Sequence, residues 1–485
     1  EVSFRSAASV MAVCEYCRTA VLKEAAAVRD IGKIAPVFED YSPLQIGVSG
    51  IWGKIGFTLV GRLQLKYGAG YWNEWRALLD DGTDAWLSDA SGQYVMTSPR
   101  PAPSTMPGFA DLKPGFGCTF AGNRYIAADV REARCVAGEG ELPFKVGEGW
   151  VLKAADFRWR DRFLTLDYSE SETPVVYAGR SVTLDELKCQ LLRSPDDIKD
   201  SAGRYRGAAV PLSCPGCGSS IEYRTGLATH VVCASCHAEV DCAGEKAEVL
   251  AKHDAIEQVA TTLKPGEEAK IGNTRWTIIG LACHTETDSG ESSTWTEYLL
   301  FNGKQGLMWL VEAADGWKRV RVLDNWPEVS GDTMRYMGDV YKKLYDYGGE
   351  VTYAAGNFNW QAQVGDCVSI TDYGHDDKRL SMEKSDTEVT WSHAQPVAAS
   401  EVMKWFGHKV DDAAALDKIA TSDGDFPSFA TGWPMWTALI LLALFNFKWM
   451  FADDDVLAMV IVGFAAWLVY LPVQIAKKFN PGGEA

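Results

Sequence analysis

The chain has 485 residues, enough for three or four domains with cores of their own. Its 47% apolar content and 18 tryptophans exclude a disordered protein. Its formal net charge of −18 argues against a nucleic-acid partner, because binding a nucleic-acid backbone needs a basic surface that releases counterions.

The cysteines divide into two groups. Six of the 12 lie in C-x-x-C pairs and the others are scattered, which is typical of metal ligands and ordinary buried thiols in a reducing compartment. No charged and then apolar segment opens the chain, so no signal peptide is predicted. Because the first residue is Glu1 and not Met, we expect a start trimmed by a few residues.

A unit of the sequence occurs twice. Residues 2–6 (VSFRS) precede Cys14 at the same distance as residues 221–225 (IEYRT) precede Cys233. The N-terminal copy lacks its first C-x-x-C pair, so residues 1–20 are predicted to be half of a zinc ribbon. The complete ribbon is predicted over residues 210–242.

Each ribbon is followed by a charged, alanine-rich stretch. These stretches predict polar linker helices over residues 21–40 and 243–265.

Two longer units follow, over residues 41–193 and 266–407. In both, aromatic and β-branched runs are interrupted by turn dipeptides, which predicts antiparallel strands joined by hairpins. The dipeptides are Asp81-Gly82, Asn302-Gly303 and Asp315-Gly316. A short helix is expected at the end of each unit, over Leu184–Leu192 and Ser400–Phe406. The predicted fold class is therefore mainly β, with two tandem antiparallel β domains of barrel or sandwich type.

The complete ribbon carries the clearest predicted site. Its spacing, C-x2-C-x15-C-x2-C, lets two C-x-x-C turns direct four sulfurs at one tetrahedral Zn²⁺. The predicted ligands are Cys214, Cys217, Cys233 and Cys236. A closed four-sulfur site leaves no position for substrate, so the zinc is expected to be structural. Cys14 and Cys17 are expected to bind the same metal once their missing partner pair is restored. The alternative, a thioredoxin-like redox pair, requires a βαβ context that the sequence lacks.

A second candidate site is acidic. Glu139 and Glu141 lie in a glycine-containing segment interpreted as a turn, and Asp156 follows on a later strand. Together they predict an acidic surface for a cationic ligand such as a polyamine or a basic protein segment. The second copy carries the amides Asn357 and Asn359 instead. The alternative interpretation is a solvated acidic edge that resists aggregation. We find no catalytic motif and predict no catalytic residue.

The C-terminal part is predicted to be a transmembrane helical hairpin over residues 432–476, after a linker over 408–431. Trp433–Phe451 and Val456–Ile475 are each long enough to span about 30 Å of hydrocarbon. Lys477 and Lys478 follow the second span, which predicts that both termini are cytoplasmic. The alternative is a buried helical hairpin of a soluble domain.

The repeated motifs W-x-E-W/Y and W-L-x-x-A, with the later G-E-L-P-F segment, resemble the bacterial domain-of-unknown-function family 4178 over residues 41–190 and 266–406. The residues that carry the resemblance are Trp72, Glu74, Trp75, Trp86, Leu87, Gly92, Glu141, Pro143, Gly147, Trp295, Glu297, Tyr298, Trp309, Leu310, Gly316 and Gly365. The resemblance implies cytoplasm-facing companions of small membrane proteins and of aminopropyltransferase-like enzymes, and thus polyamine or envelope-stress biology. It implies no fold and no catalytic residue.

Two functions follow as hypotheses. The first is a scaffold anchored in the bacterial inner membrane, with zinc ribbons and β domains in the cytoplasm, that recruits a protein partner. The second is an enzyme or polyamine-binding protein that uses an acidic pocket in the first β domain. A deep cleft found only in the first copy would favour the second hypothesis, whereas two shallow and similar surfaces would favour the first.

Overall fold

The computed structural model describes residues 9–408 with gaps, and all of them belong to the unit Glu1–Val410. The gaps are residues 14–18, 24–27, 34–39, 41, 68–69, 91, 104, 146–149, 195–196, 199–212, 220–229, 234–235, 237, 242–247, 252–260, 288–292, 303–304, 359–362 and 377.

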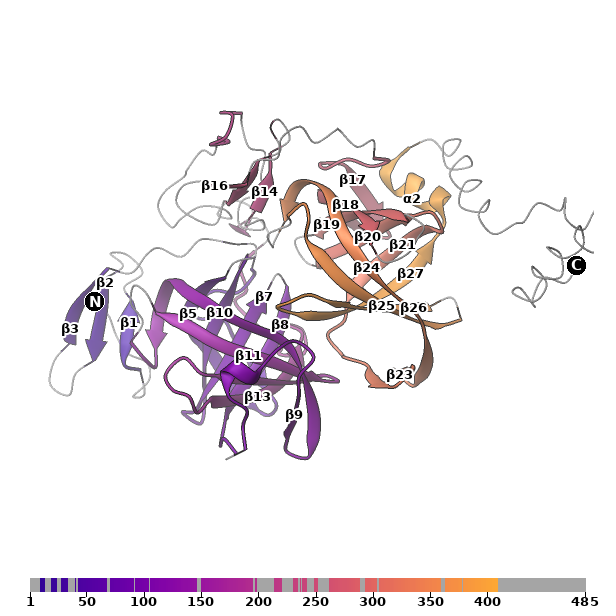
Figure 1. Cartoon of the computed structure of the whole chain (residues 1–485). Helices are drawn as coiled ribbons and strands as arrows, with labels where there is room; N and C mark the ends of the chain where they lie inside the picture. The colour runs from indigo at the N-terminus through magenta and orange to yellow at the C-terminus, as the bar shows by residue number, and fades with distance from the viewer. Residues whose placement is uncertain are drawn as a thin grey trace, which may run out of the picture. The chain divides into compact units, whose positions relative to one another are not determined.

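Eight antiparallel strands of the first copy form a closed barrel (Figure 1). In their order around the barrel they are β5 (Ile55–Tyr67), β6 (Gly70–Leu79), β7 (Asp84–Ala90), β8 (Gln93–Arg100), β13 (Val175–Val182), β12 (Arg162–Asp167), β11 (Val151–Trp159) and β10 (Asn123–Leu142). The pairing of β10 with β5 closes the ring. Three short elements flank the barrel, namely β4 (Ser49–Trp52), η1 (Phe109–Asp111) and β9 (Gly117–Phe120).

The second copy repeats this topology. In the same order its strands are β18 (Thr274–Glu286), β19 (Thr294–Asn302), β20 (Gly306–Ala313), β21 (Gly316–Val322), β27 (Val389–Val397), β26 (Lys378–Lys384), β25 (Cys367–His375) and β24 (Asp339–Phe358). Its flanking strands are β17 (Glu268–Ile271), β22 (Glu328–Ser330) and β23 (Thr333–Tyr336). The prediction of two tandem antiparallel β domains is therefore confirmed, and both are barrels.

A pair of facing glycines marks the strand pairing that closes each barrel. Gly61 of β5 faces Gly140 of β10, and Gly280 of β18 faces Gly356 of β24. Gly140 and Gly356 have φ angles of 69° and 95°. A Cβ atom on Gly140 would lie 2.2 Å from the carbonyl oxygen of Val60, and one on Gly356 would lie 2.5 Å from a carbonyl oxygen of β18. Only glycine permits this backbone angle together with so close an approach.

The two faces of the first barrel differ in polarity. The outer face of β6 to β8 carries Trp75 and Leu87, which pack beneath Leu44, Val48 and Leu187 of the flanking segments to form an apolar core. The inner face receives at least one residue from each of the eight strands and lines a cavity. Representative lining residues, in order around the barrel, are Leu63, Glu74, Ser88, Val95, Tyr177, Thr165, Asp156 and Arg131. Because the flanking segments supply apolar burial outside, the interior is free to carry polar groups.

The second barrel has the same inward face. Its lining residues in the corresponding strand order include His284, Glu297, Val311, Lys318, Ser392, Ser381, Asp372 and Tyr347.

A three-stranded ribbon extends the sheet of each barrel. The first ribbon contains β1 (Met11–Val13), β2 (Thr19–Lys23) and β3 (Val28–Lys33), and β1 pairs with β10. The second ribbon contains β14 (His230–Val232), β15 (Glu239–Asp241) and β16 (Glu248–Ala251), and β14 pairs with β24.

The predicted linker helices over 21–40 and 243–265 are therefore wrong at residues 21–23, 28–33 and 248–251, where the chain forms strands. The alanine-rich composition favours a helix locally, but each segment gains backbone hydrogen bonds by pairing onto a sheet that already exists.

The two predicted short helices have different outcomes. α2 (Ala399–Phe406) confirms the helix expected over Ser400–Phe406. The segment Leu184–Leu192 forms turns, with positive φ angles at Lys188 and Leu191, because its end turns back to form a bridge from Gln190 to the sheet.

The predicted membrane hairpin over 432–476 and the linker before it lie almost wholly outside the described residues. Within the described part of residues 9–408, no helix is long and apolar enough to cross a membrane.

Candidate functional site

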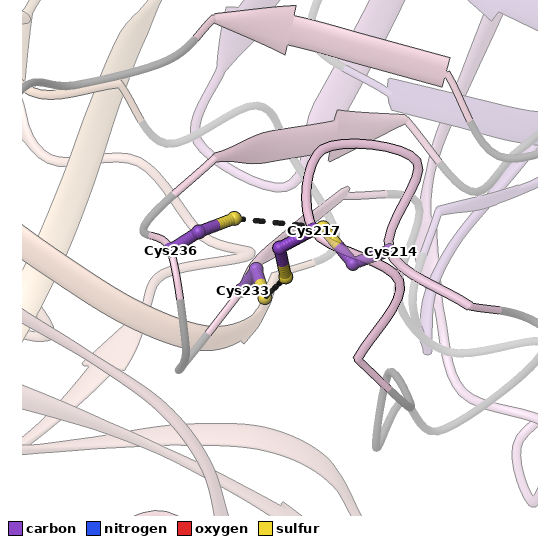
Figure 2. Close-up of side chains that lie close together, drawn as sticks. All are labelled: Cys214, Cys217, Cys233 and Cys236. Carbon is purple, nitrogen blue, oxygen red and sulfur yellow. Dashed lines mark hydrogen bonds between the residues drawn. The ribbon is translucent and has the colours of Figure 1, made fainter.

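The four cysteines predicted to bind zinc over residues 210–242 lie together (Figure 2). The Sγ atoms of Cys214 and Cys236 are 3.6 Å apart, and those of Cys217 and Cys233 are 3.9 Å apart. All four sulfurs lie within 4.8 Å of one another. Tetrahedral coordination at about 2.3 Å per bond places sulfurs about 3.8 Å apart, so the four thiols fit a single metal ion.

The two turns that carry the sulfurs are held by backbone hydrogen bonds. The Gly218 amide donates to the Cys214 carbonyl at 2.7 Å, and the Cys233 amide donates to the Ala238 carbonyl at 3.0 Å. A Cβ atom on Gly216 would lie 3.4 Å from Cys236 Sγ. Glycine at this position therefore keeps the space beside the sulfurs open.

The electrostatics of the cluster favour a thiolate at its exposed edge. The hydroxyl and backbone N–H of Ser219 lower the pKa of the Cys217 thiol to about 6. Burial raises the pKa of the Cys214 thiol. Metal ligation requires thiolates, and a bound dication would favour that form in all four residues.

This cluster is the single group of three or more metal-ligating side chains in the described part of the chain. The predicted ligands Cys14 and Cys17 lie outside the described residues. The structure therefore brings the complete predicted set together and leaves the half-set as a prediction.

The interior of the first barrel holds a set of hydrogen-bonded carboxyl groups. Trp72 Nε1 donates to Glu74 Oε1 at 2.7 Å, and Ser88 Oγ donates to Glu74 Oε2 at 2.7 Å. Thr165 Oγ1 donates to Asp156 Oδ1 at 2.6 Å. Burial raises the pKa of Glu74 to about 7, although the hydrogen bonds from Ser88 and Trp72 oppose the shift. Burial also raises the pKa of Asp156.

The second barrel repeats this arrangement. Trp295 Nε1 donates to Glu297 Oε1 at 2.9 Å, and Ser381 Oγ donates to Asp372 Oδ1 at 2.6 Å. A further acidic residue, Glu383, lies at the register position of Asp167 in the first barrel.

The three residues of the predicted acidic surface separate into two groups. Glu139 and Glu141 lie within strand β10, so their assignment to a turn is wrong. Glu139 is buried with its Oε1 atom 3.7 Å from Arg62 Nη1, and Glu141 accepts a 2.5 Å hydrogen bond from Ser9 Oγ. Asp156 lines the barrel interior. Gly140 has a positive φ but stays in regular pairing with β5 and β1, so the glycine-rich segment that suggested a turn continues the strand.

The interior carboxyl groups of Glu74 and its counterpart Glu297 were not predicted as site residues. A signal was available, because residues i and i+2 of a strand share a face. The repeated W-x-E motif therefore places an indole N–H beside a carboxyl group in both copies.

Comparison with known proteins gives a family and no function. The family model described as "Domain of unknown function (DUF4178)" matches residues 45–184 and 264–399, which together exceed half of the chain. No curated protein and no solved structure matches the chain. The two matched regions coincide with the two barrels, and the chain therefore belongs to the DUF4178 family, of which it carries two tandem copies.

Proposed function

We propose that the protein is a metal-stabilised scaffold of the bacterial inner membrane that recruits a protein partner through its cytoplasmic β domains. The observation that carries this proposal is the continuity of the second ribbon with its barrel. β14 leads into Cys233 and pairs with β24, which also closes the barrel. A metal ion held at the end of β14 would therefore fix the position of the ribbon relative to the barrel. The two together would form one surface for binding a partner protein.

The proposed metal is Zn²⁺ in a structural role. Four cysteine sulfurs at tetrahedral spacing are the preferred ligands of zinc, and a closed shell has no open position for substrate. The proposed membrane anchor is the hairpin over 432–476, and its support is the sequence alone. A partner surface other than nucleic acid agrees with the net charge of −18.

The metal is tested by elemental analysis of the purified full chain. We expect the wild type to bind zinc, and Cys217→Ser to lose the ion held by this cluster while both barrels stay folded. Cys367→Ser is the matched control, because Cys367 is an exposed cysteine outside the cluster. A wild-type protein without zinc would overturn the assignment.

The recruiting role is tested by crosslinking in membranes followed by purification through a tag. We expect a defined partner protein that is retained by Cys367→Ser and reduced by Cys217→Ser, because the ribbon would lose its fixed position. Equal recovery with both variants would separate partner binding from the metal.

A second candidate function is ligand binding or acid–base chemistry in the first barrel. One observation favours it: Asp156 shares the interior with Glu74, and the pKa of Glu74, at about 7, suits proton transfer near neutral pH. Calorimetry with spermidine tests the polyamine form of this proposal. Heat that disappears in the Asp156→Asn variant would support it, and no heat with the wild type would retire it.

A further inference from the structure

The second barrel contains a buried histidine without a hydrogen-bond partner. His284 is 9% exposed, and among the described residues neither its Nδ1 nor its Nε2 atom forms a hydrogen bond. Its ring stacks on Trp295 at 5.1 Å between centroids, and Glu297 Oε2 lies 3.6 Å from Nε2, beyond hydrogen-bond distance. Buried polar atoms are almost always satisfied, so this side chain points to a missing ligand.

The same interior carries acidic charge that its own basic residues do not fully offset. Lys318 and Arg379 act on Asp372 and lower its pKa against the larger effect of burial. Glu383 has no such neighbour among the groups that shift it. Burial and then the negative charges of Glu297, Glu388 and Asp372 raise the pKa of Glu383 to about 8. A bound cation would favour the ionised form of Glu383.

In the first barrel, the side chain of an arginine carries a positive charge at the position equivalent to this part of the second barrel. The guanidinium of Arg131 lies 4.0 Å from the ring centroid of Tyr67 and 5.7 Å from that of Trp72. Arg131 pairs with the residue two positions before Asp156, and in the second barrel Tyr347 pairs with the residue two positions before Asp372. Tyr347 is therefore the register counterpart of Arg131.

The difference between Arg131 and Tyr347 changes which side chains line the barrel interior. The ring of Tyr347 meets that of Trp295 edge to face at 6.0 Å, where the first barrel has a guanidinium against Trp72. The second barrel thus keeps the tryptophan and the carboxyl groups of the first barrel, and it lacks the arginine that lies against the tryptophan. In the first barrel that arginine, Arg131, forms ion pairs with Asp129 and with Glu388 of the second copy.

We propose that the second barrel binds a small organic cation with a guanidinium or ammonium group in this interior. Trp295 and Tyr347 offer aromatic faces to the cation, Glu297 and Glu383 pair with it, and His284 accepts one of its N–H groups. The interior of an eight-stranded barrel holds one small ligand, which favours a small molecule over a protein segment. The site goes beyond the scaffold role and does not depend on the metal.

The test is calorimetric titration of the purified full-length protein with three probes that share a butyl chain: n-butylguanidinium, n-butylammonium and n-butanol. We expect at least one of the cations to bind with a stoichiometry of one, and the uncharged alcohol not to bind. Glu297→Gln keeps an acceptor for the Trp295 indole and removes the charge, so it should weaken binding about 10-fold to 100-fold. Glu172→Gln, at an exposed position outside both barrel interiors, is the charge-matched control and should change affinity by less than about 3-fold.

Two reciprocal variants test the comparison between the barrels. Tyr347→Arg supplies the second barrel with its own guanidinium and should abolish binding. Arg131→Ala opens the first barrel and should raise the stoichiometry from one to two. If Tyr347→Arg does not fold, as judged from its melting curve, Glu297→Gln decides the question. The proposal is overturned if neither cation binds at about 10 mM, if butanol binds equally well, or if Glu172→Gln and Glu297→Gln weaken binding alike.

Discussion

A single residue, Glu74, makes the stability of the first barrel depend on pH. Its carboxyl group accepts hydrogen bonds from Trp72 and Ser88, yet burial outweighs both bonds and raises its pKa from 4.5 to about 7. Between these two values the folded protein holds a proton that the unfolded chain releases. The free energy of unfolding therefore falls as pH rises from about 4.5 to about 7, and this contribution is constant at higher pH.

Glu74→Gln removes this dependence. Relative to the wild type, the variant should gain up to about 3 kcal/mol in the free energy of unfolding between pH 5 and pH 8, since each pKa unit corresponds to about 1.4 kcal/mol. Urea denaturation followed by tryptophan fluorescence at the two pH values measures the difference. The exposed Glu172 gives the control, and Glu172→Gln should change the pH dependence by less than about 0.5 kcal/mol. A parallel pH dependence of wild type and Glu74→Gln would contradict the proposed burial of charge.

At the scale of elements, the long strands β10 and β24 connect ribbon and barrel. Each pairs with a ribbon strand near its C-terminal end and also with the strand that closes its barrel. The facing glycines occur within this double pairing. We call the pairing of β10 with β5, and of β24 with β18, the seam of each barrel. A change at the seam should therefore disturb both the barrel and the ribbon.

Gly140→Ala tests the seam. Gly122 also has a positive φ, 79°, but a Cβ atom there meets nothing within 4 Å. Gly122→Ala should thus cost only the backbone penalty of about 1 kcal/mol. Gly140→Ala adds a collision with the Val60 carbonyl oxygen, so it should cost at least about 2 kcal/mol more. Chemical denaturation of both variants measures this difference, and equal costs would argue against the close approach.

At the scale of the whole molecule, the sequence predicts a soluble part and a membrane anchor. We expect the full chain to sediment with membranes, and a chain that ends after Thr431 to remain in the soluble fraction, because Trp433–Phe451 and Val456–Ile475 would be missing. Sedimentation after cell breakage measures the distribution. A full chain found in the soluble fraction would contradict the anchor.

The predicted orientation has a separate test. A cysteine introduced in the segment Asp453–Asp455 should react with a membrane-impermeant reagent added from outside the inner membrane. Labelling from the cytoplasmic side alone would reverse the orientation and leave the anchor intact.

Local sequence patterns were sufficient to predict several features of this protein. The duplication, the β class, the hairpin turn at Asp81-Gly82 and the helix at Ser400–Phe406 could be read from repeated motifs, alternation and turn residues. The four cysteines could be assigned to one metal site from the sequence, because the spacing within each C-x-x-C pair lets its two sulfurs bind the same ion.

Tertiary structure decided the remaining features. The charged, alanine-rich segments predicted to be linker helices contain strands instead. β2 pairs with β1, β3 with β2, and β16 with β15, and this pairing supplies hydrogen bonds that local propensity does not anticipate. Glu139 and Glu141 were predicted to lie on a turn, but they lie in strand β10 and are buried beside Arg62 and Ser9. The alternation of a strand says which residues share a face, but only closure of the sheet into a barrel decides that the face of Glu74 and Glu297 is the interior.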